Sequence, residues 1–161
     1  MKSNVLVVKS RIVLEIIEAR TKFKPFNSWH EAYAVIKAEI EELFESLGRM
    51  TGIDERELVQ VAAMSVCAIS ECNGIPQKWN EVLDEAAASS LLDQEAGPID
   101  DPGYLSAFVR HNFFNQLQIF WESVKKDKGA TQPLYTIVSL AILLLNELEN
   151  KKGLCADTTQ S

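Results

Sequence analysis

The sequence predicts an all-α protein, a bundle of about six helices, and three observations lead to this prediction. Apolar residues recur at helical spacing along most of the 161 residues. Only 7 Gly and 5 Pro are present, fewer than a loop-rich β protein or a disordered chain contains. The breaks between the periodic segments are a few residues long, which is typical of antiparallel helices packed as neighbours.

The first three helices are expected in residues 4–22, 27–47 and 54–72. Pro25 ends the first of them, because the residue before a proline disfavours the helical conformation. Asn27 or Ser28 can cap the second helix, and Asp54 can cap the third. A glycine follows the end of both, as is common at helix C-termini.

The last three helices are expected from Pro76 to the Gly97-Pro98 break, and over residues 102–127 and 132–150. Proline is favoured in the first turn of a helix, which places two of the starts at Pro76 and Pro102. Residues 153–161 are polar and are expected to form a flexible tail. Residues 1–152 then form a single domain.

Charge, hydropathy and cysteine content exclude several functions. The net charge of −7 argues against binding of a nucleic-acid backbone, which needs clustered Lys and Arg. The longest apolar run, Thr136–Leu145, is about half as long as a membrane span. Cys67, Cys72 and Cys155 have neither an even count for disulfides nor the spacing of a zinc site. Reduced thiols and a cytoplasmic location are therefore expected.

A weak internal repeat relates two parts of the chain at an offset of 77 residues. The segment FESL at 44–47 recurs as WESV at 121–124. The repeat is either a duplicated helical hairpin, residues 27–73 and 104–150, or a chance similarity of two amphipathic hairpins. The second copy has Gln116 where the first has Glu39.

Four polar side chains of the second and third helices can meet at one place. Glu39 and Glu42 are three residues apart and share a face at the edge of the apolar stripe. Glu57 and Gln60 have the same spacing on the next helix, which is apolar almost all round and therefore buried. In an antiparallel hairpin the two faces can lie opposite each other. Acids at the margin of a core need a compensating cation, and Mg²⁺ prefers carboxylate oxygens.

Each of these residues also has an interpretation without function. Glu39 and Glu42 could belong to a solvated acidic face. Glu57 could complete a capping box with Asp54. His30, in the first turn of the second helix, is either a solvated surface histidine or a substrate-binding residue. Among the basic residues, proximity in sequence points to Lys22, Lys24 and Arg49 as candidates for phosphate binding.

Three sequence blocks carry a resemblance to a known family: SWHEAYAVI at 28–36, EIEELF at 39–44 and ELVQVAAM at 57–64. In this order they resemble the MazG-like proteins of phages and bacteria, which belong to the all-α nucleoside triphosphate pyrophosphohydrolases. Members hold magnesium with an E-x-x-E pair on one helix and an E-x-x-D pair on the next. The resemblance implies that Glu39, Glu42 and Glu57 are Mg²⁺ ligands, with Gln60 as a weak ligand or a water-orienting group. It also implies hydrolysis of a nucleoside or deoxynucleoside triphosphate to the monophosphate and pyrophosphate by a metal-bound water.

The chain departs from the family pattern at two positions. Ala38 stands where many members have a further acid, and Gln60 stands where the second pair ends in Asp. A neutral amide supplies less charge to hold a cation. The alternative hypothesis is therefore a non-catalytic MazG-like helical module, with a decayed site, that binds a nucleotide or another protein.

The resemblance also bears on assembly, because family members commonly bring two hairpins together around the substrate. Here residues 104–150 are expected to play the partner's part, packed against 27–73 as a pseudo-twofold pair with one metal site per chain. The residues expected to be buried between the hairpins are Phe113, Leu117, Phe120, Ile137 and Leu144. A further homodimer is expected from Phe114 and Trp121, which add apolar surface beyond one stripe.

Overall fold

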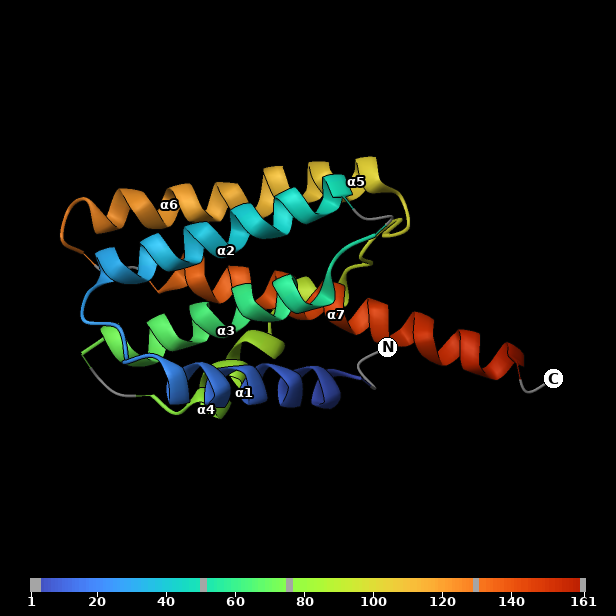
Figure 1. Ribbon diagram of the computed structural model, residues 1–161, viewed down its shortest axis with the longest axis horizontal. Helices are drawn as coiled ribbons and strands as arrows, with labels where there is room; N and C mark the ends of the chain where they lie inside the picture. Colours follow the sequence, from blue (N-terminus) through green and yellow to red (C-terminus); the bar gives the residue numbers. More distant parts are fainter. Residues whose placement is uncertain (1–3, 50–51, 75–76, 129–130, 160–161) are drawn as a thin grey trace.

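The computed structural model describes residues 4–49, 52–74, 77–128 and 131–159, the last five of these as backbone only. No strand occurs among these residues, and the predicted all-α bundle of about six helices is confirmed (Figure 1). The α-helices are α1 (Val5–Lys22), α2 (Trp29–Arg49), α3 (Glu55–Cys72), α4 (Trp79–Ala87), α5 (Pro102–Phe108), α6 (Phe114–Val124) and α7 (Gln132–Thr159). A 3₁₀ turn, η1 (Ser90–Asp93), follows α4, and a π-helical turn, η2 (Val109–Phe113), joins α5 to α6 in one continuous helix.

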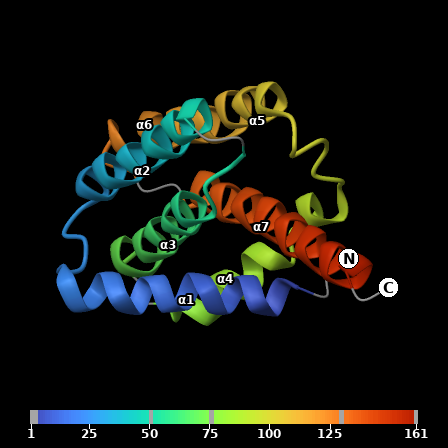
Figure 2. The ribbon, with the colours of Figure 1, turned by 45° about the vertical axis from the view of Figure 1, so that its right-hand side comes forward.

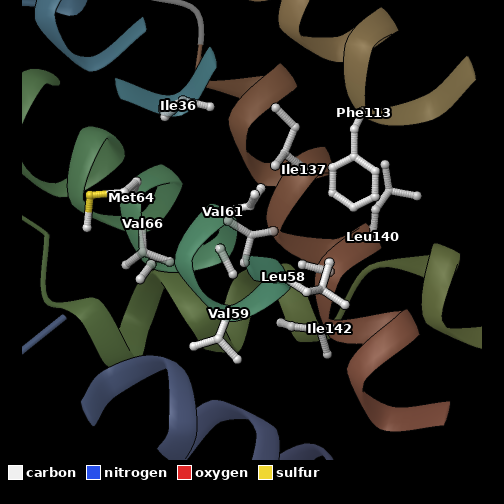
Figure 3. Packing of buried hydrophobic residues seen from close by; sticks show 14 of the residues in the cluster. Ile36, Leu58, Val59, Val61, Met64, Val66, Phe113, Ile137, Leu140 and Ile142 are labelled. Carbon is white, nitrogen blue, oxygen red and sulfur yellow. The ribbon is translucent and has the colours of Figure 1, made fainter. Parts of the chain in front are cut away.

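The helices form three layers, with α3 and α7 in the middle (Figures 1 and 2). One outer layer consists of α2 and the continuous helix α5–α6, and the other consists of α1 and α4. Every residue of α3 from Val61 to Ile69 is buried, as its nearly all-round apolar sequence predicts. Figure 3 shows part of this core, where apolar side chains of α3 and α7 meet.

The two predicted hairpins lie side by side, with α2 antiparallel to α5–α6 and α3 antiparallel to α7 (Figure 1). Tyr33 of α2 stacks on Trp121 of α6, with ring centroids 4.6 Å apart. The Arg110 guanidinium lies 5.5 Å from the centroid of the Phe44 ring. The offset of 77 residues pairs Tyr33 with Arg110 and Phe44 with Trp121. Exchanging the two hairpins therefore converts the first contact into the second, as a pseudo-twofold relation requires. The residues expected between the hairpins are all buried: Phe113, Leu117, Phe120, Ile137 and Leu144.

Phe114 and Trp121 pack against α2 of the same chain. The Phe114 ring meets Phe44 edge-on at 5.7 Å, and Trp121 stacks on Tyr33. Much of the apolar surface from which the sequence predicted a homodimer is thus used inside the chain.

The expected fourth helix is interrupted, and its predicted extent to Gly97 is wrong. α4 begins at Trp79 and ends at Ala87, and the predicted start at Pro76 lies outside the described residues. Ser89 then caps the 3₁₀ turn, its Oγ accepting a hydrogen bond from the Leu91 N–H at 3.3 Å. Serine side chains compete with the helical hydrogen bonds of the backbone, which explains the break.

The last two helices also end where the sequence did not predict. The α5–α6 helix ends at Val124, and Asp127 has a φ of 53°, in the left-handed region that ends helices. α7 continues through Gly153 to Thr159, beyond the expected end at 150. One glycine inside a helix costs only about 1 kcal/mol relative to alanine, too little to stop a long helix that packs well.

Two further expectations concern the membrane and the thiols. None of the described helices combines the length and the apolar character of a membrane span. Cys67 is buried and Cys72 is half-buried, and both are free thiols. Cys155 lies outside the residues whose side chains are described.

Candidate metal site and adjoining cleft

The first turns of α2 and α3 are fixed by capping side chains. Ser28 Oγ accepts a hydrogen bond from the Glu31 N–H at 3.1 Å, and Glu31 Oε2 accepts one from the Asn27 N–H at 2.9 Å. In α3, Asp54 Oδ1 accepts a hydrogen bond from the Arg56 N–H at 2.9 Å. These caps stabilise both helix starts.

The rotation of α2 buries its predicted apolar stripe and leaves acids at the edge of that stripe. The buried members are Ala32, Ile36, Ile40, Leu43 and Leu47. Glu39 is half-buried and Glu42 is exposed, whereas Glu45 is exposed and pairs with Arg49 at 3.8 Å. The acids of α2 therefore divide between a margin next to α3 and a solvated face.

Glu39, Glu42 and Glu57 come together where α2 meets the start of α3. One carboxylate oxygen from each lies within 4.8 Å of the other two. In the described part of the chain no hydrogen bond joins Glu57 to the Asp54 backbone, so Glu57 does not complete a capping box. The antiparallel hairpin thus brings the three acids together, as the spacing of the sequence predicts.

The three acids lie in an environment that disfavours negative charge. Burial raises the pKa of Glu39 to about 7, and the charges of Glu42, Glu57 and Glu15 add to this rise. Burial also raises the pKa of Glu57, with Glu42 contributing in the same direction. Such a cluster favours either a bound proton or a bound cation.

Two buried oxygens of this cluster lack a donor among the residues that the structure describes. Glu39 Oε2 and Glu57 Oε2 are buried and receive no hydrogen bond from this part of the chain. An unsatisfied buried carboxylate oxygen is costly, and a hard divalent cation would satisfy both oxygens and offset the repulsion between the acids. The donor set, three carboxylates with an amide nearby, fits Mg²⁺.

Gln60 faces the same space, one turn after Glu57. It lines a cleft together with Glu39, and its side chain makes no hydrogen bond to any residue that the structure describes. Its amide is thus available to a cation or to a water molecule.

The cleft has a volume of about 750 Å³ and lies between α1, α2 and α3. Glu39, Val35 and Gln60 contribute to its wall from the predicted hairpin. The wall from α1 and the segment after it was predicted only at Lys22 and Lys24, and it also includes Glu15 and Phe23. Sequence reasoning missed the rest of this wall because nothing in the periodicity of α1 indicates which helices its polar face approaches.

The basic residues and His30 are distributed unequally around this cleft. Lys22 and Lys24 line it, whereas Arg49 does not. The exposed His30 ring meets Trp121 edge-on at 6.3 Å, on the α6 side of α2, and His30 is not among the residues that line the cleft. Of the predicted residues, Glu39, Gln60, Lys22 and Lys24 line the cleft, whereas Glu42, Glu57, Arg49 and His30 are not among its lining residues.

Comparisons with protein-family models, with curated proteins and with solved structures gave no match. The chemistry available to the site therefore follows from its own residues. Three convergent carboxylates, one of which lines a cleft, can hold a divalent cation against a bound polyanion.

Proposed function

We propose that the protein is a magnesium-dependent nucleoside or deoxynucleoside triphosphate pyrophosphohydrolase of the MazG-like type. The observation that supports this most is the convergence of Glu39, Glu42 and Glu57, of which Glu39 also lines a cleft. The MazG-like resemblance of residues 28–64 links such acids to this reaction. An acidic protein of net charge −7 needs a cation to bind a polyanion, which fits the same assignment.

In this proposal each residue of the site has a distinct role. Glu39, Glu42 and Glu57 hold the cation, which gives the buried oxygens of Glu39 and Glu57 the partner that no described residue supplies. Bound magnesium supplies positive charge for the phosphates and the means to activate water at neutral pH. Gln60 orients a water molecule or adds a neutral ligand. Rigid helices position all four side chains.

The test is a product assay on the purified chain. The eight common ribo- and deoxyribonucleoside triphosphates are incubated with and without MgCl₂, and monophosphate and pyrophosphate are measured. We expect both products in equal amounts and only with Mg²⁺. Glu39→Gln, Glu42→Gln and Glu57→Gln should each abolish turnover, whereas Glu45→Gln, on the solvated face of α2, should not.

The alternative, a non-catalytic module, is favoured by Gln60 and Ala38, which leave the site with fewer acids than the family pattern. Magnesium-dependent nucleotide binding without products would support this alternative and contradict the hydrolase. No turnover, together with no Mg²⁺-dependent shift of the thermal midpoint, would also favour the non-catalytic module, in its protein-binding form, and contradict the hydrolase.

A further inference from the structure

The cleft between α1, α2 and α3 has two different ends. Two ion pairs set α1 and α3 parallel: Arg11 contacts Glu55, and Arg20 contacts Glu71. The cleft-lining part of α1, from residue 11 to 22, is about 16 Å long at the usual helical rise. The acids and the first turns of α3 lie at the Arg11 end. The chain that leaves α1 lies at the Arg20 end.

The cations of the cleft are mostly engaged by carboxylates of the protein. Those already in ion pairs are Arg11, Arg20 and Lys22. Lys24 and Arg56 also line the cleft, and neither has an ion-pair partner within the described segments. Arg56 lines the cleft, and its charge acts on the Glu57 carboxylate, favouring the ionised form, so the guanidinium lies within electrostatic reach of the acids. A polyanion held at the acids through a cation would find Arg56 next to it.

Apolar side chains lead from the acids to the other end of the cleft. Val35, Val59 and Met64 line this path. Phe23 lies at the far end with 69% of its surface exposed, and its ring contacts no aromatic ring or cation in the part of the chain described. An uncovered aromatic ring at the wall of a cleft offers a stacking surface to a planar ligand.

We propose that a nucleoside triphosphate binds along the length of this cleft, with its phosphates at Glu39 and Arg56 and its base stacked on Phe23. The identity of the ligand rests on the proposed function, whereas the orientation rests on the charges and the apolar path. Phosphates match the end with the acids, a bound cation and a free guanidinium. A planar base matches the end with the uncovered ring, and Val59 and Met64 face the sugar between them.

Calorimetry with α,β-imido analogues of the four deoxynucleoside triphosphates in MgCl₂ tests this orientation without turnover. Phe23→Ala should weaken binding about tenfold. Leu6→Ala is the matched control. Leu6, on α1, is 72% exposed, similar to Phe23, but it does not line the cleft. Arg56→Ala should reduce the preference for the triphosphate analogue over the monophosphate roughly tenfold. Arg49→Ala, at the exposed end of α2, should leave this preference unchanged.

The outcomes separate this inference from the proposed function. Binding that depends on Phe23 and Arg56, with no hydrolysis of natural triphosphates, supports the orientation and contradicts the hydrolase. Hydrolysis with a KM that neither Phe23→Ala nor Arg56→Ala changes overturns the orientation and leaves the hydrolase standing. Analogue affinities equal to those of the unmodified chain in both variants, or no analogue binding at all, also overturn the orientation.

Discussion

Glu39 on α2 and Glu57 on α3 each have a buried Oε2 oxygen without a hydrogen-bond partner in the described segments, and a carboxylate oxygen of each lies within 4.8 Å of one of Glu42. Like charges in this arrangement repel each other and are poorly solvated. The hairpin of α2 and α3 therefore carries a local destabilisation that a divalent cation would relieve. This relation has measurable consequences for stability, whether or not the protein turns over a nucleotide.

Removal of divalent metal should lower the thermal midpoint, and Glu39→Gln should uncouple the midpoint from Mg²⁺. At a Mg²⁺ concentration of 100 times Kd, binding to the folded state stabilises it by about 2.7 kcal/mol. In the EDTA-treated protein at pH 8, Glu39→Gln should instead raise the midpoint, because it removes a buried charge beside two other acids. Differential scanning calorimetry with and without MgCl₂ measures both effects. An unchanged Mg²⁺ response in Glu39→Gln would contradict the assignment of Glu39 as a ligand, and Glu45→Gln is the control.

The stability of the metal-free protein should fall as the pH rises through neutrality. The pKa of Glu39 is about 7 in the folded chain against an ordinary value of 4.5, mainly because of burial. The folded state thus favours the protonated carboxyl, whose stabilising contribution is complete below pH 4.5 and is lost as the pH rises through 7. Urea denaturation in EDTA between pH 5 and 8.5 measures the slope, and Glu39→Gln should flatten it.

The same proton competes with the metal. Because Glu39 must lose its proton to bind a cation, the affinity for Mg²⁺ should rise over the pH range in which Glu39 ionises. Titration of the protein with MgCl₂ at several pH values follows this change. An affinity that is constant from pH 6 to 8 would mean that Glu39 does not bind the ion.

Sequence periodicity predicted the first three helices well because strong local signals bound them. Pro25, Ser28 and Asp54 each act where a chain must leave or enter a helix, and the observed bounds lie within two residues of those expected. The convergence of Glu39 and Glu57 was also predictable. A short connection forces α2 and α3 to be antiparallel, and the spacing of the acids then sets the face that each helix presents.

Other features depend on contacts that periodicity does not encode. The π turn at 109–113 keeps the α5–α6 helix continuous, with Asn112 Nδ2 donating to the Phe108 carbonyl oxygen at 2.9 Å. The wall of the cleft formed by α1 depends on two ion pairs across long stretches of chain, made by Arg11 and Arg20. A charged residue has many possible ion-pair partners, and the sequence does not indicate which of them it contacts in the fold.

Phe120 should be a major contributor to the packing between the two hairpins. It is fully buried on α6, and its ring lies 5.9 Å from Trp29 and 6.1 Å from Tyr33 of α2. Phe120→Ala should reduce the free energy of unfolding by about 4 kcal/mol, since it removes buried surface and leaves a cavity. Ile119→Ala, one residue earlier and 45% exposed, is the control and should have a much smaller effect. Equal losses in urea denaturation would show that the interface between the hairpins is not the stabilising element inferred here.

Arg20 should stabilise the fold far more than its neighbour Lys22 does, although each forms an ion pair in the structure. Arg20 Nε and Nη2 donate to the two oxygens of Glu71 at 2.6 Å, and both side chains are only 12% exposed. Arg20→Ala leaves the largely buried Glu71 carboxylate without its cationic partner, so the free energy of unfolding should fall by about 3 kcal/mol. Lys22 pairs with Glu18 at the wall of the cleft, where both side chains are 61% exposed, and Lys22→Ala should change stability little. Urea denaturation at pH 7 compares the two variants.

Because the Glu71 carboxylate also accepts a hydrogen bond from the Phe26 N–H at 3.1 Å, the loss of Arg20 should loosen the chain that leaves α1 as well. Amide exchange should then accelerate at Phe26 in Arg20→Ala and stay unchanged in Lys22→Ala, and an equal response of the two variants would contradict this account.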